Sequence, residues 1–144
     1  MARRPVALVA AIVLVLEAFG IAFVNLILGK VADNQNMSLA GLRPSAISTG
    51  SWIAGGLFGV YLLLCAFFPL RAGITDHGPG RFGRILLITC AVVHGVLGAL
   101  TLGLVGWPAF AAMIVVLGLI VLTLVAYDGD HPEPVVAEGT PAAV

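Results

Sequence analysis

Charged side chains are scarce in this sequence. Seven basic and seven acidic residues make up 10% of the 144 residues and give a formal net charge of zero, whereas about a quarter of the residues of a soluble protein are charged. The chain therefore lacks the clustered Lys and Arg that bind nucleic-acid phosphates, and we predict no nucleic-acid partner. Because 60% of the residues are hydrophobic and the mean hydropathy is +1.12, the composition predicts a protein that resides in the lipid bilayer.

Cysteines and recognisable catalytic motifs are also few. Cys65 and Cys90 are the only cysteines, and they lack the C-x-x-C spacing; we interpret them as small packing residues, with a disulfide or a quinone-linked redox pair as the alternative. The acids and the histidine of segment 128–133 stand in a stretch that contains Pro132 and Pro134 and is followed by no predicted helix, so they form no loop that could close around an ion. We predict that the protein is not an enzyme, with no catalytic residues, no metal and no cofactor.

Four apolar segments are long enough to cross the hydrocarbon core, which takes about 20 helical residues. They cover about 5–28, 49–70, 83–105 and 108–127. The first segment exceeds the apolar region of a signal peptide, so we interpret it as a retained helix. The sequence predicts an all-α membrane protein, with a four-transmembrane-helix bundle as one domain at 1–128 and a disordered acidic cytoplasmic tail at 129–144.

The positions of the basic residues predict the orientation. With the N-terminus inside, five arginines lie on the cytoplasmic side and two basic residues outside, which favours N-in/C-in under the positive-inside rule. The inner residues are Arg3, Arg4, Arg71, Arg81 and Arg84, and the outer ones are Lys30 and Arg43. The single Lys among abundant Ala, Val, Leu and Gly is typical of high-GC bacteria, so we expect a multi-pass protein of the bacterial plasma (inner) membrane.

Glu17 is the acidic residue inside the first apolar segment, and an ionisable group at membrane depth indicates a functional site. Counting 1.5 Å per residue from the basic helix ends places Glu17 about 19 Å deep, and Tyr61 and His94 each about 15 Å deep. The second and third segments are antiparallel, so an alignment that sets Cys65 opposite Cys90 also sets Tyr61 opposite His94. We therefore predict a mid-membrane cluster of Glu17, Tyr61 and His94.

Rows of small residues predict the helix-packing surfaces, because they let helices approach closely in a membrane. Gly20 follows Glu17 on the first segment. The other rows are Ser51, Gly55 and Gly59 on the second segment, and Ala91, Gly95, Ala99 and Gly103 on the third. We expect the second segment to use its row against the first segment or against another protomer.

Two functions remain open for Glu17. A buried polar residue can join helices or fix an oligomer contact, which favours an interaction or accessory subunit that binds a second copy or another membrane protein. The alternative is a proton-coupled transporter of small molecules. Protonating an ordinary carboxylic acid at pH 7 costs about 3.7 kcal/mol, similar to the roughly 2.5 to 3.5 kcal/mol for a charge at mid-membrane, so a proton could move with little bias.

The Glu17 and Gly20 spacing resembles the first helix of the small multidrug resistance transporters, which implies a proton and substrate role for Glu17. In this sequence Asn25 stands where that family usually has Lys. The segment Leu39-Ala40-Gly41-Leu42-Arg43-Pro44, before a Gly-rich helix, looks like the layout of DoxX-type membrane proteins. The general pattern is also similar to small four-helix integral membrane proteins of actinobacteria.

Overall fold

The computed structural model describes residues 3–35 and 41–130. Four helices follow one another: α1 (Arg3–Asn34), α2 (Pro44–Thr75), α3 (Gly80–Leu104) and α4 (Trp107–Ala126), with a short 3-10 turn, η1 (Asp128–Asp130), after the last. All four are long and apolar enough to cross a membrane, and the described part of the chain has no strand. The predicted all-α class and the four apolar helices are therefore confirmed.

The first two helices are longer than the apolar segments from which they were predicted. Each has 32 residues and would extend about 48 Å, against a hydrocarbon core of about 30 Å. Residues 29–34 and 44–48 of the connection expected between 28 and 49 are thus helical, and α2 starts at Pro44, a residue suited to the first helical turn. Of the predicted disordered tail, residues 131–144 lie outside the described part of the chain.

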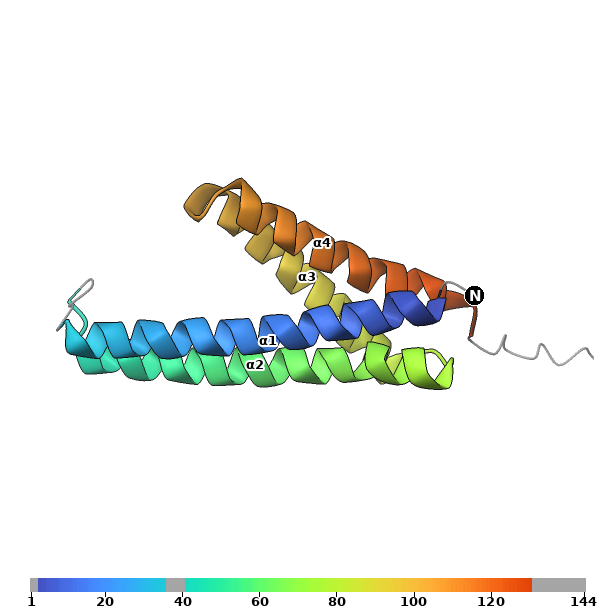
Figure 1. Ribbon diagram of the computed structural model, residues 1–144, viewed down its shortest axis with the longest axis horizontal. Helices are drawn as coiled ribbons and strands as arrows, with labels where there is room; N and C mark the ends of the chain where they lie inside the picture. The colour runs from blue at the N-terminus through green and yellow to red at the C-terminus, as the bar shows by residue number, and fades with distance from the viewer. Residues whose placement is uncertain (1–2, 36–40, 131–144) are drawn as a thin grey trace, which may run out of the picture.

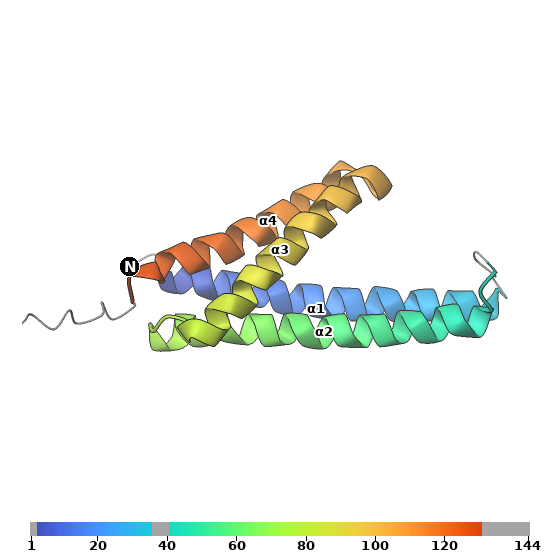
Figure 2. The ribbon, with the colours of Figure 1, turned by 180° about the vertical axis from the view of Figure 1, so that it is seen from behind.

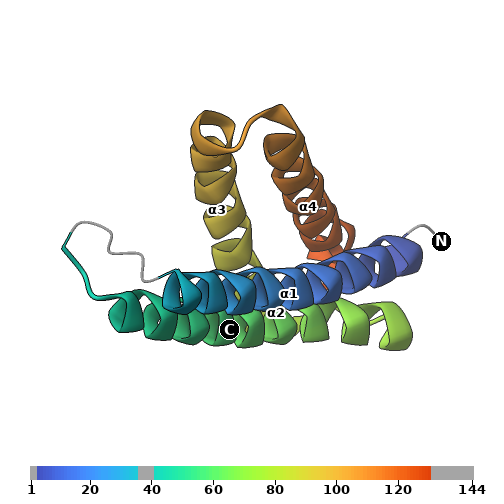
Figure 3. The same ribbon diagram turned by 60° about the vertical axis from the view of Figure 1, so that its left-hand side comes forward.

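The helices form two antiparallel hairpins that diverge from one end (Figure 1). The α1 and α2 helices pack along their length, and α3 and α4 form the second hairpin. The hairpins meet near the N-terminus and the α2–α3 connection, and the α3–α4 turn lies well away from the first hairpin (Figures 2 and 3). The arrangement is therefore an open V rather than a closed bundle of parallel axes.

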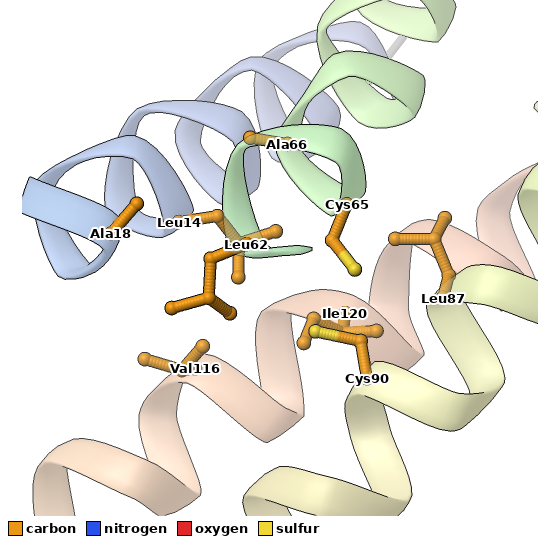
Figure 4. Close-up of a cluster of buried hydrophobic side chains, with 9 residues drawn as sticks. All are labelled: Leu14, Ala18, Leu62, Cys65, Ala66, Leu87, Cys90, Val116 and Ile120. Carbon is orange, nitrogen blue, oxygen red and sulfur yellow. The ribbon is translucent and has the colours of Figure 1, made fainter. Parts of the chain in front are cut away.

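The core lies where the two hairpins meet, and all four helices contribute to it (Figure 4). Its buried members are Leu14, Ala18, Leu62, Cys65, Ala66, Leu87, Cys90, Val116 and Ile120. Most other large apolar side chains on the helices are exposed, as expected where lipid replaces water. Burial within the chain is therefore concentrated at the closed end of the V.

Small residues pack α2 against α1, as the sequence predicted for the second segment. Gly55 and Gly59 are buried, and a Cβ atom on Gly55 would lie 2.5 Å from the Asn25 Cβ. Ser51 is partly buried on the same side of α2. Gly20, by contrast, is exposed and a Cβ there would meet no atom within 4 Å, so Gly20 makes no close helix approach among the described residues.

The small-residue row of α3 does not form the packing surface expected of it. Ala99 and Gly103 are exposed and Ala91 and Gly95 are only partly buried. The buried stripe is the neighbouring one of Cys90, His94 and Gly98, where a Cβ on Gly98 would lie 3.4 Å from Met113 of α4. Adjacent residues of a helix point about 100° apart, so the rotation that buries His94 turns the small row toward the surface.

Polar contacts join the helix ends at the closed end of the V. The Arg3 and Arg4 Nε atoms lie 3.1 and 3.2 Å from the two oxygens of Asp76, which follows α2. The Tyr127 hydroxyl donates to the Ala72 carbonyl oxygen at 3.0 Å, and the Arg3 guanidinium lies 5.4 Å from the Tyr127 ring centre. The N-terminus, the α2–α3 connection and the end of α4 therefore share one face of the molecule.

Candidate functional site: a buried carboxyl–imidazole pair

Glu17 and His94 meet between the two hairpins. The Glu17 Oε2 atom lies 2.9 Å from His94 Nε2, and the side chains are 12% and 1% exposed. Within the described residues, the α1 and α3 backbones do not run alongside each other, so two long side chains span the separation. The contact expected between Glu17 and His94 is thus present, at the edge of the core cluster.

The other imidazole nitrogen fixes where the protons are. His94 Nδ1 lies 2.8 Å from the Cys90 carbonyl oxygen, and a carbonyl oxygen can only accept, so Nδ1 carries a hydrogen. A neutral imidazole protonated on Nδ1 has a bare Nε2 atom, which accepts a hydrogen bond from the O–H group of a neutral Glu17 acid. The other arrangement is an imidazolium that donates to a Glu17 carboxylate.

Both arrangements of the pair have the same net charge. A neutral acid with a neutral imidazole sums to zero, and so does a carboxylate with an imidazolium. One proton is therefore shared between Glu17 and His94, and its transfer within the pair creates no net charge in the apolar core. Removing that proton would leave a buried negative charge, which is costly without a partner.

Two thiols lie next to the imidazole. The Cys90 Sγ atom is 3.6 Å from His94 Nδ1, and the Cys65 and Cys90 side chains, both fully buried, are members of one core cluster. Both are free cysteines and belong to the core cluster drawn in Figure 4. Cys65 of α2 and Cys90 of α3 thus share the core where these two helices meet.

Tyr61 does not join the pair. Its hydroxyl lies 3.4 Å from the Thr89 Oγ1 atom, and Thr89 in turn donates to the Leu86 carbonyl oxygen at 2.8 Å. The prediction assumed parallel axes for α2 and α3, under which one aligned pair implies the next. Because α3 leans away from α2 beyond the crossing (Figure 2), His94 instead faces α1.

Thr89 was not predicted as a partner of Tyr61. Its signal in the sequence is weak, because a Thr in a membrane helix commonly bonds a carbonyl of its own preceding turn, as Thr101 and Thr123 do here. Within residues 3–35 and 41–130, no group of three or more His, Cys, Asp or Glu residues is arranged to hold a metal ion. The chemistry that the Glu17–His94 hydrogen bond offers is proton sharing.

Comparison with protein-family models, with curated proteins and with solved structures finds no match to this chain. The fold and the site define its class: a small multi-pass, all-helical membrane protein with a carboxyl–imidazole pair buried between two hairpins.

Proposed function

We propose that this chain is an interaction or accessory subunit in a bacterial plasma membrane, with Glu17 and His94 acting as a clamp between its two hairpins. The observation that carries the proposal is the 2.9 Å hydrogen bond between these side chains, which links α1 to α3. Hydrogen bonds between membrane helices typically contribute about 0.6 to 2 kcal/mol. The clamp would fix the angle of the V that gives the molecule its shape.

Exposed apolar stripes support a role in association. Phe19 and Phe23 on α1, and Val96 and Leu100 on α3, are each one helical turn apart and more than half exposed. Side-chain packing, rather than hydrophobicity, drives helix association in lipid, and bulky shapes at regular spacing offer such packing. The partner in this proposal is a second copy of the chain or another membrane protein.

The position of the cavities also favours the clamp. A cavity of about 490 Å³ lies at the closed end of the V, and one of about 320 Å³ lies between α1 and α2. Neither is lined by Glu17 or His94. A transporter that used this pair would need space for substrate beside it.

Proton-coupled transport of a small molecule is the second candidate. The proton shared between Glu17 and His94 supports it, because that proton can move without a change in net charge. The resemblance of the Glu17 and Gly20 spacing to small multidrug resistance transporters also favours it. In this alternative, protonation of the pair would be linked to substrate movement.

Glu17→Gln separates the two candidates. The Gln amide can donate to the bare His94 Nε2 atom, so a clamp keeps its stability, whereas Glu17→Ala lowers the free energy of unfolding by about 0.6 to 2 kcal/mol. The measurements are unfolding in mixed detergent and decay of a pH gradient in liposomes. If the pair is a clamp, no variant should make the pH gradient decay faster than it does in empty liposomes. If the native chain speeds the decay and Glu17→Gln abolishes this effect, the result supports transport instead.

Association needs its own measurement. A photo-crosslinking amino acid at Phe23 or Val96 in native membranes should give a discrete band of higher mass, from a second copy or another protein. The same amino acid at Leu14, which is fully buried, is the matched control and should give none. Equal patterns at the exposed and buried positions would contradict the proposal.

The proposed orientation places both termini in the cytoplasm, on the basis of the five inner arginines. In a variant with Cys65→Ala and Cys90→Ala, a cysteine at Gly78 should react with a membrane-impermeant maleimide only after the cells are opened. A cysteine at Leu42 should react in intact cells. The opposite pattern would reverse the orientation.

A further inference from the structure

A groove of about 320 Å³ follows the seam between α1 and α2, at the end remote from the N-terminus. It is lined by Ala22, Leu26, Lys30, Trp52 and Gly56. The three α1 residues are spaced by four, and so are the two α2 residues, so the groove runs along one face of each helix. From Ala22 to Lys30 it extends about 12 Å along α1.

Small residues produce the deep part of this groove. Gly56 has no side chain, and a Cβ atom there would meet no other atom within 4 Å, so the space beside it is open. Trp52 forms the wall at the other end because its indole packs directly over Gly29, where a Cβ would overlap the ring. The indole Nε1 donates to the Leu26 carbonyl oxygen at 3.4 Å, which holds the ring in place.

A single cation lies at the mouth of the groove. Lys30 is exposed, and within the described residues it has no ion-pair partner. It lies about 20 Å along α1 from Glu17, a depth at which Lys and Trp side chains sit among lipid headgroups. Asp33 follows one turn later and is also exposed. Its negative charge opposes that of a ligand, so a headgroup with more negative charge than a single phosphate would gain little affinity there.

We propose that this groove is a binding site for one phospholipid, with an acyl chain along the Ala22–Gly56 seam and the phosphate beside the Lys30 ammonium. The apolar lining of the groove fits a hydrocarbon chain. A small hydrated anion would leave this apolar part of the groove unfilled. The Lys30 ammonium, which forms no ion pair with any residue of 3–35 or 41–130, fits the phosphate. The groove faces the bilayer along a membrane-spanning helix pair, where such a ligand is always at hand.

Lipid titration of the purified chain by native mass spectrometry tests this site, with phosphatidylglycerol and diacylglycerol of the same acyl chains as probes. The native chain should bind phosphatidylglycerol about fivefold more tightly, the gain expected of one Lys near a lipid phosphate. Lys30→Gln should lose this preference and Lys30→Arg should keep it. Arg43→Gln, which removes a basic side chain at the same end but outside the groove, should leave it unchanged.

Gly56→Leu tests the acyl part of the site, because its side chain fills the groove without a clash at Cβ. It should weaken binding of both lipids, whereas Gly50→Leu, also on α2 with open space at Cβ, should not. Thermal unfolding verifies that both variants fold. If Gly56→Leu does not fold, the binding measurements on the Lys30 variants alone decide the proposal. A fivefold preference that survives Lys30→Gln, or native affinity in folded Gly56→Leu, would overturn the proposal.

Discussion

Glu17 Oε2 lies 2.9 Å from His94 Nε2, and the opposite nitrogen of the same imidazole bonds the Cys90 carbonyl oxygen at 2.8 Å. The imidazole is thus held at both ends, by its own helix and by α1. A ring fixed in this way cannot rotate to exchange its nitrogens without breaking both bonds. The pair is therefore a rigid link between the hairpins as well as a place for one shared proton.

The link predicts a measurable coupling between the two side chains. In a double-mutant cycle of Glu17→Ala and His94→Ala, the free energies of unfolding should deviate from additivity by about 1 kcal/mol, because each single variant already removes the shared bond. Unfolding in mixed detergent followed by circular dichroism measures the cycle. As a control, Glu17→Ala with Thr101→Ala should be additive, since Thr101 bonds the Gly98 carbonyl of its own helix. Additivity within about 0.3 kcal/mol in the first cycle would rule out the coupling.

The proton positions make a second prediction. Nitrogen-15 NMR of histidine-labelled protein should show His94 protonated on Nδ1 at every pH at which the fold persists, because the Cys90 carbonyl oxygen requires a donor. The His94→Gln variant identifies the resonances of this ring. Glu17→Gln should leave Nδ1 protonated while Nε2 becomes an acceptor from the amide. A neutral ring protonated on Nε2 would contradict the geometry.

The four helices and the Glu17–His94 contact could be predicted because the sequence shows where apolar segments lie and how deep each residue is along its helix. The length of an apolar segment indicates that a helix crosses the membrane there, although α1 and α2 extend beyond their segments, and counting residues along a straight helix gives the depth of each side chain. Glu17 on α1 and His94 on α3 have similar depths, and this was enough to predict that they meet. The prediction that Tyr61 joins this pair was wrong because its position also depends on the angle between α2 and α3, and residue counting gives no information about that angle.

The buried face of α3 could not be predicted for a related reason. Leu62, Leu63 and Leu64 have the same side chain, yet the first is fully buried and the other two are 41% and 54% exposed. In a soluble protein the exposed positions would be polar and would identify the inner face. Lipid accepts leucine as readily as the core does, so the pattern that would locate α3's buried stripe is missing from the sequence.

The α1–α2 seam makes a prediction about two glycines. Gly55→Ala should lower the free energy of unfolding by about 1 to 3 kcal/mol, because its Cβ would lie 2.5 Å from the Asn25 Cβ and force the helices apart. Gly20→Ala, where no atom lies within 4 Å, should cause no loss and a gain of up to about 1 kcal/mol. Thermal or detergent unfolding compares the two variants. Equal destabilisation by both would mean that Gly20 packs against a second chain.

The crossing of α2 and α3 makes the last prediction. Copper-phenanthroline with oxygen should convert Cys65 and Cys90 to a disulfide within one chain, since both are free and buried in the same core cluster. The two thiols lose two protons and two electrons, which oxygen accepts. Mass spectrometry under non-reducing conditions should find a monomer lighter by two hydrogens, and Cys65→Ala should remain unchanged. Because α3 diverges from α2 beyond this point, the cross-link would fix the hairpins at their crossing and raise the unfolding temperature. Formation of dimers alone, with no cross-linked monomer, would show that the two thiols do not meet within a chain.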